Sequence, residues 1–176
     1  MPSASTDAWH DVVLATLKNN DVRLTTYVPD KVLIPLIDGV HADPFFTAFT
    51  ATREEEAIGI CAGAWMGGMR GVVMMQTSGF GNVPNALASL AVAYQIPVIL
   101  LVSERGAFGE FNIGQVWSSR VVAPVCDALG IVHHTLERLD TLEFVLDRSI
   151  KQAVATQAPV AFVLSPLLTG GKVFGA

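Results

Sequence analysis

Three consecutive glutamates, Glu54, Glu55 and Glu56, precede a stretch rich in alanine and glycine that has the composition of a tightly packed helix. Acidic side chains in the first turn of a helix interact favourably with the helix dipole, and this alone explains most such runs. A carboxyl group buried in that position would instead have a raised pKa and would be suited to moving protons. The residues alone leave these two interpretations evenly balanced.

A second group of candidate residues follows the next apolar run, where the chain reads T-S-G-F-G-N from Thr77 to Asn82. Two glycines between a strand and a helix are typical of part of a dinucleotide-binding loop. However, Pro84 stands where that motif has its third glycine, and no acid ends a following strand at the required distance. A nicotinamide site is therefore not expected. The plain alternative is a strand-to-helix turn that needs small residues.

Other catalytic and metal centres are not expected either. His133 and His134 lie within one predicted strand, so their side chains point to opposite faces of a sheet and cannot act together. No Cys or His has the spacing of zinc ligands, and the G-x-S-x-G sequence of serine hydrolases does not occur. We predict no metal site on this chain.

The segments that would position the candidate residues alternate between apolar strands and helices. Helices are predicted over 9–17, 32–37 with an end at Gly39, 53–66, 85–94, 116–129 and 142–155, with caps from 5–7 for the first and from Thr52 for the third. Strands are predicted over 22–28, 45–51, 72–76, 97–103, 131–135 and 160–165.

This alternation predicts a single doubly wound α/β domain with a six-stranded, mostly parallel sheet over residues 1–170, followed by a tail over 171–176. Ligands of such sheets bind at the carboxyl ends of the strands. We therefore expect 54–56, 77–82 and the glycine-containing loop 104–115 to meet at one edge of the sheet.

Composition excludes several classes of partner. The chain has a net charge of −5 and no cluster of basic residues, so binding to nucleic acid or to an anionic membrane is not supported. The start of the sequence does not resemble a signal peptide, and the most apolar stretch, 87–102, is interrupted by Gln95 and Pro97. Cys61 and Cys126 are expected to be reduced packing residues of a cytoplasmic protein.

The hydrophobic content of 51% with only 15% charged residues is high for a soluble monomer. Strands buried on both faces of a sheet, a large subunit interface, or both would account for it.

From Arg53 to Arg105 the sequence resembles the pyrimidine-binding domain of thiamine-diphosphate enzymes. The resemblance rests on R-E-E-E-A-I-G-I-C-A-G-A-W, on V-M-M-Q-T-S-G-F-G-N-V-P-N-A-L-A-S-L and on I-P-V-I-L-L-V-S-E-R-G, and it continues through G-E-F-N-I-G-Q. It is most similar to the alpha subunits of sulfopyruvate decarboxylases and the equivalent half of phosphonopyruvate decarboxylases. The resemblance implies a six-stranded parallel α/β domain, in agreement with the alternation of elements.

The resemblance also implies roles for individual residues. In this family a glutamate ten residues before the aromatic residue of an A-x-G-Y-like segment hydrogen-bonds N1′ of the cofactor's aminopyrimidine and promotes its imino tautomer. Counting back from Trp65 gives Glu55, which the resemblance implies is catalytic and buried. The turn matches the family's N-S-G-x-G-N at most positions, and the implied cofactor contacts are Glu55, Thr77, Ser78, Gly79 and Asn82. The implied substrate contacts are Ser78, Asn112 and Gln115.

The implied activity is that of a carboxy-lyase, which decarboxylates a small 2-oxo acid with thiamine diphosphate and Mg²⁺. The chain lacks the G-D-G sequence that begins the family's diphosphate and magnesium motif. The resemblance therefore implies a separate beta subunit that carries G-D-G, holds Mg²⁺ and shares the cofactor with this chain. Self-association of the chain is expected as well.

Two positions differ from the family pattern, and they leave alternatives open. Thr77 replaces an Asn and is typical of the acetolactate synthase branch, while Trp65 replaces a Tyr. The alternatives are a carboligating, acetolactate-synthase-like enzyme half and a non-catalytic regulatory homologue of the same fold.

Overall fold

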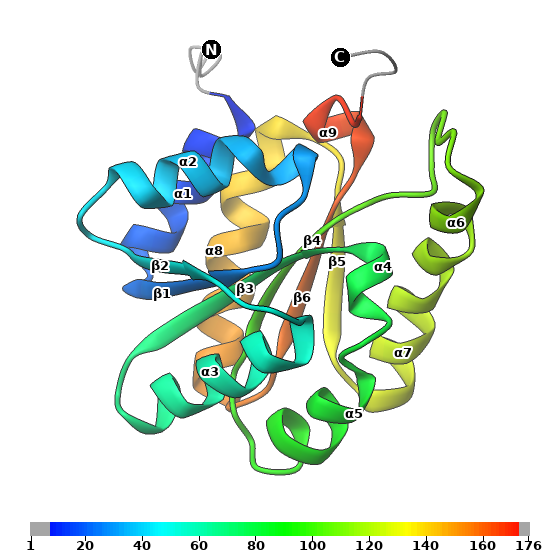
Figure 1. Cartoon of the computed structure of the whole chain (residues 1–176). Coiled ribbons are helices and arrows are strands. Elements are labelled where there is room, and N and C mark those ends of the chain that lie inside the picture. The colour runs from blue at the N-terminus through cyan, green and yellow to red at the C-terminus, as the bar shows by residue number, and fades with distance from the viewer. Residues whose placement is uncertain (1–7, 173–176) are drawn as a thin grey trace.

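The apolar runs form one sheet in a computed structural model, which describes residues 8–172. All strand pairs are parallel, and the strand order is β2-β1-β3-β4-β6-β5 (Figure 1). The strands are β1 (Val22–Tyr27), β2 (Thr47–Thr50), β3 (Arg70–Gln76), β4 (Ile99–Ser103), β5 (Val132–Leu136) and β6 (Val160–Leu164). The predicted six-stranded α/β architecture is confirmed. The cap predicted at 5–7 and the end of the predicted tail lie outside the described residues.

Helices cover both faces of the sheet because its strands alternate their apolar side chains between the two faces. On one face, Val72 and Met74 of β3 pack with helices α1 (Trp9–Asn19), α2 (Ile34–Ala42) and α8 (Leu139–Thr156). On the other face, Val73 and Met75 pack with α3 (Glu54–Met66), the π-helix η2 (Leu87–Val92) and α7 (Val122–Leu129) (Figure 1). Figure 1 shows the sheet between these two layers.

Helix α2 continues past Gly39, where the sequence predicted its end. A Cβ atom at Gly39 would lie 2.3 Å from Cδ1 of Leu14, so the glycine lets α1 and α2 pack closely in the interior of the helix. Gly39 is thus a packing residue and not a stop signal.

The turn before α2 is η1 (Lys31–Leu33). Asp30 precedes it, and the carboxylate of Asp30 accepts a hydrogen bond from the N–H of Val32.

The helix predicted over 116–129 is divided into α6 (Ile113–Val116), η3 (Ser118–Val121) and α7. Pro124 explains the break between η3 and α7, because it has no N–H to donate and its ring would clash with the carbonyl of Arg120 in a continuous helix. Three further short helices were not predicted as separate elements: α4 (Thr77–Phe80), α5 (Pro84–Ala86) and α9 (Pro166–Thr169). Ser165 caps α9 by accepting a hydrogen bond from the N–H of Leu167.

The predictions about the cysteines and about His133 and His134 agree with the structure. Burial raises the pKa of Cys61 to about 12 and that of Cys126 to about 11, so both are unreactive packing thiols. His133 pairs with Asp127 on one face, and Nε2 of His134 lies 3.0 Å from Oγ of Ser149 on the other. Within residues 8–172, no helix combines the length and the apolar character needed to cross a bilayer.

The chain order creates a crevice at the carboxyl edge of the sheet. In the sheet, β1 lies between β2 and β3, and β4 lies on the far side of β3. The chain therefore runs from β1 to β2 in one direction across the sheet and from β3 to β4 in the opposite direction. Loops that leave β1 and β3 therefore diverge, which is the arrangement in which open α/β sheets bind ligands.

Candidate active site

The three segments expected at the carboxyl edge meet there. Glu54, at the start of α3, accepts a hydrogen bond of 2.8 Å from Nδ2 of Asn82, which ends the turn after β3. Thr77, at the start of that turn, accepts a hydrogen bond of 3.1 Å from the N–H of Arg105 in the loop after β4. The predicted convergence is confirmed, and each contact joins residues far apart in sequence.

Glu54 is the buried acid of the glutamate run. It is 7% exposed, and it shares the buried face of α3 with residues at spacings of three, four, seven and eight: Ala57, Ile58, Cys61 and Ala62. Its Oε2 is held by Asn82, and its Oε1 lies against the backbone of Gly79. A Cβ atom at Gly79 would stand 2.2 Å from Oε1, so only glycine leaves room for this carboxylate.

Glu55 and Glu56 point elsewhere. The side chain of Glu55 is 36% exposed, and its Oε1 accepts a hydrogen bond of 2.5 Å from Nε of Arg53. Its own backbone N–H and then Arg53 hold the pKa of Glu55 below the usual 4.5, which favours a permanent carboxylate. Glu56 is exposed and accepts a hydrogen bond from the N–H of Thr52. The prediction that Thr52 caps α3 is wrong, because Arg53 occupies the N-cap position. Thr52 instead donates its backbone N–H to the first turn of the helix.

The turn T-S-G-F-G-N forms one helical turn, α4, directly after β3. The hydroxyl of Thr77 is buried and is used within the protein, because it bonds both the N–H and the carbonyl oxygen of Arg105. Ser78 is half-buried and Asn82 lies at the surface. Thr77 therefore links two turns of the site, while Ser78, Gly79 and Asn82 form its wall.

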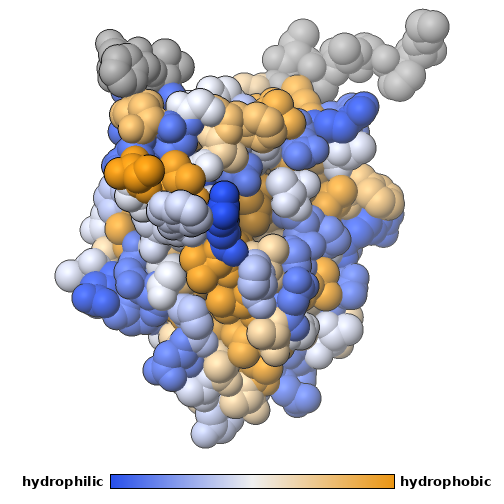
Figure 2. Space-filling model, turned by 90° about the vertical axis from the view of Figure 1, so that its right-hand side faces the viewer, coloured by the Kyte–Doolittle hydropathy of each residue, from blue (hydrophilic) through white to orange (hydrophobic). Residues whose placement is uncertain are grey.

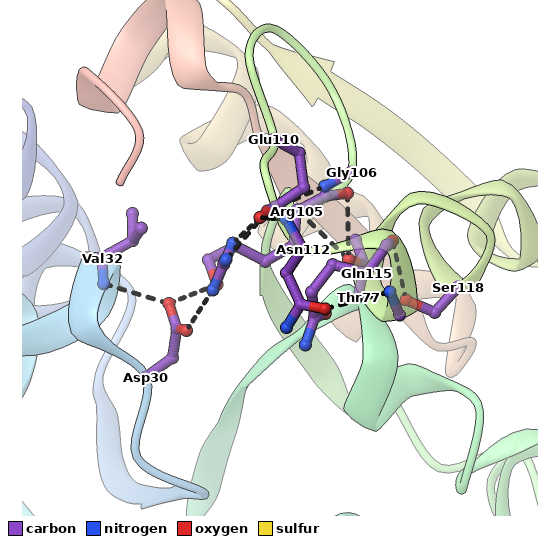
Figure 3. A network of polar contacts seen from close by, with 11 residues as sticks. Asp30, Val32, Thr77, Arg105, Gly106, Glu110, Asn112, Gln115 and Ser118 are labelled. Atoms are coloured by element: carbon purple, nitrogen blue, oxygen red, sulfur yellow. Dashed lines mark hydrogen bonds and ion pairs between the residues drawn. The ribbon is translucent and has the colours of Figure 1, made fainter. Parts of the chain in front are cut away.

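Arg105 is the centre of a buried group of charges (Figure 3). Its guanidinium lies between Asp30, at 3.5 Å, and Glu110, at 2.8 Å, and all three side chains are at most 6% exposed. Asp30 also accepts hydrogen bonds from Ser103 and from the N–H of Val32. Burial alone would raise the pKa of Glu110, but the N–H of Asn112, Arg105 and the N–H of Gly106 outweigh it and lower the pKa. We call Asp30, Arg105 and Glu110 the charge triad.

The charge triad holds the loop on which two predicted substrate contacts lie. Asn112 is exposed, and its Oδ1 accepts a hydrogen bond from the N–H of Gly114. Gln115 is half-buried, and its Oε1 is covered without a hydrogen-bond partner among the described residues. The same holds for Oε1 of Gln76, the last residue of β3. Such orphaned acceptors are costly unless a ligand or water satisfies them.

Comparison with known proteins shows which family the chain belongs to. The sequence model described as "Thiamine pyrophosphate enzyme, N-terminal TPP binding domain" matches residues 8–111, which is more than half of the chain. The chain belongs to this family. The resemblance predicted from the sequence is confirmed, and thiamine pyrophosphate is another name for thiamine diphosphate.

Two curated relatives within the thiamine pyrophosphate enzymes carry activity names. Sulfopyruvate decarboxylase subunit alpha of Methanothermobacter thermautotrophicus is 35% identical over 158 residues, which cover 86% of this chain and 96% of the relative. Phosphonopyruvate decarboxylase of Streptomyces viridochromogenes is 40% identical over 98 residues, which cover 56% of this chain but 25% of the relative. The match to the alpha subunit therefore extends over almost all of that subunit.

A solved structure supports the fold. The 2-oxoglutarate:ferredoxin oxidoreductase of Magnetococcus marinus superimposes with a TM-score of 0.71 at 13% identity, covering 93% of this chain and 29% of the other. At this identity the likeness concerns the α/β fold alone.

A second count along the thiamine pyrophosphate family pattern gives a different glutamate from the count that started at Trp65. The family segment A-x-G-Y has its aromatic residue directly after the glycine, whereas here Ala64 stands between Gly63 and Trp65. Counting from Gly63 as the family glycine gives Glu54. We favour Glu54 for the role because its whole side chain is buried, whereas at Glu55 only Oε2 is covered, without a hydrogen-bond partner among the described residues. The periodicity of the buried face of α3 is the signal in the sequence that predicts Glu54 as the glutamate with a buried side chain.

Proposed function

We propose that this chain is the alpha subunit of a thiamine-diphosphate-dependent decarboxylase that acts on a 2-oxo acid with a sulfonate or phosphonate group. The relatives of known name support the reaction class and these two substrates. The observation that carries the proposal is Glu54, a buried carboxylate held by Asn82 against Gly79 at the carboxyl edge of a thiamine pyrophosphate enzyme domain.

The residues at the edge fit part of the cofactor. Gly79 leaves room for the Glu54 carboxylate beside the backbone of the turn, and so allows a buried acid at this edge of the sheet. We assign contacts with the cofactor to Glu54, Ser78, Gly79 and Asn82, and a supporting role to Thr77. Contacts with the substrate are assigned to Ser78, Asn112 and Gln115, of which Gln115 carries an unsatisfied acceptor.

Each residue then has a stated task. Bound thiamine diphosphate supplies the electron sink for the loss of CO2 from the 2-oxo acid. Asn82 fixes Oε2 of Glu54 and leaves Oε1 to hold or release a proton at N1′ of the aminopyrimidine. Thr77 fixes the turn relative to the loop after β4, because its hydroxyl bonds the backbone of Arg105. The charge triad keeps that loop in place.

We propose that a second subunit completes the enzyme. The chain contains no G-D-G sequence, and we assign that motif, Mg²⁺ and the cofactor's diphosphate to a separate beta subunit. The near-complete match to a relative named as a subunit alpha supports this division. Both cysteines are buried and unpaired, as in a protein of the reducing cytoplasm, where we expect the enzyme to work.

The test is CO2 release by this chain reconstituted with its diphosphate-binding subunit. With thiamine diphosphate and Mg²⁺ present, we expect sulfopyruvate or phosphonopyruvate to be decarboxylated with a higher kcat/KM than pyruvate, and omission of the cofactor to abolish turnover. Cofactor binding without CO2 release from any 2-oxo acid would identify a non-catalytic homologue. Condensation products formed in the presence of a second 2-oxo acid or an aldehyde would identify a carboligase.

The replacement Gly79→Ala tests the fit between the turn and Glu54. The new Cβ would stand 2.2 Å from Oε1 and 2.6 Å from Cδ of Glu54, so the carboxylate must move. Because a shift of about 1 Å in a catalytic group can cost on the order of 100-fold, we expect kcat/KM to fall by about that factor. Gly59→Ala is the matched control, since nothing lies within 4 Å of its new Cβ. Unchanged turnover of Gly79→Ala would contradict the proposed position of the carboxylate.

A further inference from the structure

Segment 106–117 turns large apolar side chains outward. Phe108, Ile113 and Trp117 are 68%, 76% and 62% exposed, and Arg120 stacks on the Trp117 ring at 4.6 Å. We call Phe108, Ile113 and Trp117 the apolar loop surface. On the face of the molecule that carries α6 and α7, apolar surface extends from the centre downward, with hydrophilic side chains on both flanks and across its upper end (Figure 2). Apolar patches of this kind mark interaction sites more often than single exposed side chains do.

The loop that carries this surface is held in one conformation. Glu110 is tied to Arg105 and also accepts hydrogen bonds from the N–H groups of Gly106 and Asn112. Gly106 has a φ of +85°, and a Cβ there would lie 2.4 Å from the carbonyl oxygen of Gln115, so the two ends of the loop touch.

Phe108 itself has a positive φ of 39°, which is uncommon for a bulky residue. The charge triad thus holds a phenylalanine outward in a strained conformation.

The apolar loop surface is continuous with the edge of the active site. The N–H of Arg105, where the loop begins, bonds Thr77, and α4 packs against η3 next to Trp117. A protein that binds this surface would therefore also cover the turn that contains Ser78 and Gly79.

We propose that the apolar loop surface is a docking site for the diphosphate-binding subunit. This inference rests on the proposed function, in which a second subunit must reach the cofactor from the carboxyl edge. Rigid aromatic and branched side chains lose little entropy on binding and are typical anchors of interfaces. The matching face of the partner should be an apolar pocket at the edge of its own cofactor site, and the charge triad keeps the anchors ready for it.

A second apolar region serves as the comparison surface. Met66 and Tyr94 are 80% and 72% exposed and line a groove with Trp65, Leu90 and Ile96. Met66 ends α3 and Tyr94 precedes β4, so this groove lies at the amino edge of the sheet, opposite the site. A subunit that supplies the diphosphate site has no need to reach it.

The experiment measures binding of the full chain to the purified diphosphate-binding subunit by isothermal titration calorimetry. We expect Ile113→Glu and Trp117→Ala each to raise Kd by at least about 30-fold, the effect of losing one interface anchor. Glu110→Gln should weaken binding less, because it frees the loop without removing an anchor. Tyr94→Glu, the matched control, should bind as the wild type does. Thermal unfolding checks that Ile113→Glu, Trp117→Ala and Tyr94→Glu are as stable as the wild type, and circular dichroism checks that Glu110→Gln is folded at the temperature of the titration.

Wild-type affinity of Ile113→Glu and Trp117→Ala, or an equal loss in Tyr94→Glu, would overturn the proposal. The proposal would also be overturned if Ile113→Glu separated a dimer of this chain and left the affinity for the partner unchanged, since the surface would then bind a second copy.

The docking proposal and the proposed function are contradicted by different results. A wild-type complex that forms but releases no CO2 would contradict the proposed function and leave the docking site intact.

Discussion

Glu54→Gln is expected to lower the turnover of the assembled enzyme by about two to four orders of magnitude, the usual contribution of acid–base assistance. Glutamine keeps the size of the side chain and can still accept the hydrogen bond from Asn82, but it cannot exchange a proton with the aminopyrimidine. The measurement is kcat for CO2 release at saturating thiamine diphosphate, together with cofactor affinity, which should change much less than kcat.

Glu55→Gln and Glu56→Gln are the matched controls, because they make the same chemical change one and two residues away. Glu55 is half-exposed and paired with Arg53, and Glu56 is exposed, so both variants should keep turnover close to that of the wild type. If Glu55→Gln loses activity and Glu54→Gln keeps it, then Glu55 is the acid that exchanges a proton with the aminopyrimidine, as the count from Trp65 predicts.

Arg105→Met is expected to lower the free energy of unfolding by about 3–5 kcal/mol, the usual cost of breaking a buried ion pair from one side. The change leaves the carboxylates of Asp30 and Glu110 buried without their counter-charge, at 4% and 5% exposure. For a chain of this size such a loss corresponds to a decrease in melting temperature of roughly 10 °C. Thermal or urea unfolding of the isolated chain measures it.

Two further variants separate charge from packing. Arg53→Met removes an exposed pair with Glu55 and should change stability by less than about 1 kcal/mol. The triple variant Asp30→Asn, Arg105→Met, Glu110→Gln removes all three charges and should recover most of the loss. A triple variant as unstable as Arg105→Met would show that the guanidinium acts through packing and hydrogen bonds alone.

Acid adds a check on Glu110. Its pKa is lowered in the folded chain, so the stability that it contributes is present above the ordinary value of 4.5 and is lost as the pH falls through the folded pKa. The free energy of unfolding of the wild type should therefore fall as the pH drops below about 4.5, and Glu110→Gln should show no decrease from this group.

The alternation of strands and helices could be predicted because its signals are local. Runs such as 98–102 are apolar throughout, and a strand buried on both faces requires that composition. The meeting of 54–56, 77–82 and 104–115 followed from parallel topology alone, since carboxyl ends of parallel strands share one edge. These features depend on the pattern of the sequence and not on individual contacts.

The features that could not be predicted depend on tertiary contacts. Gly39 has the appearance of a helix end until the position of Leu14 is known, because a glycine that ends a helix and one that permits close packing are identical in sequence. The charge triad joins residues 75 positions apart, and no local pattern connects Asp30 to Arg105. Which of the three glutamates has a buried side chain can be predicted from the period of α3, because Glu54 is three, four, seven and eight residues from the apolar residues of its buried face.

The contact between Glu54 and Gly79 also has an evolutionary consequence. Because a side chain at 79 and a carboxylate at 54 cannot occupy the same space, the two positions should change together among related chains. A homologue that has lost the acid at 54 is released from the need for glycine at 79, and larger residues should then accumulate there. The pair can thus serve as a marker that distinguishes chains that retain the reaction from chains that keep only the fold.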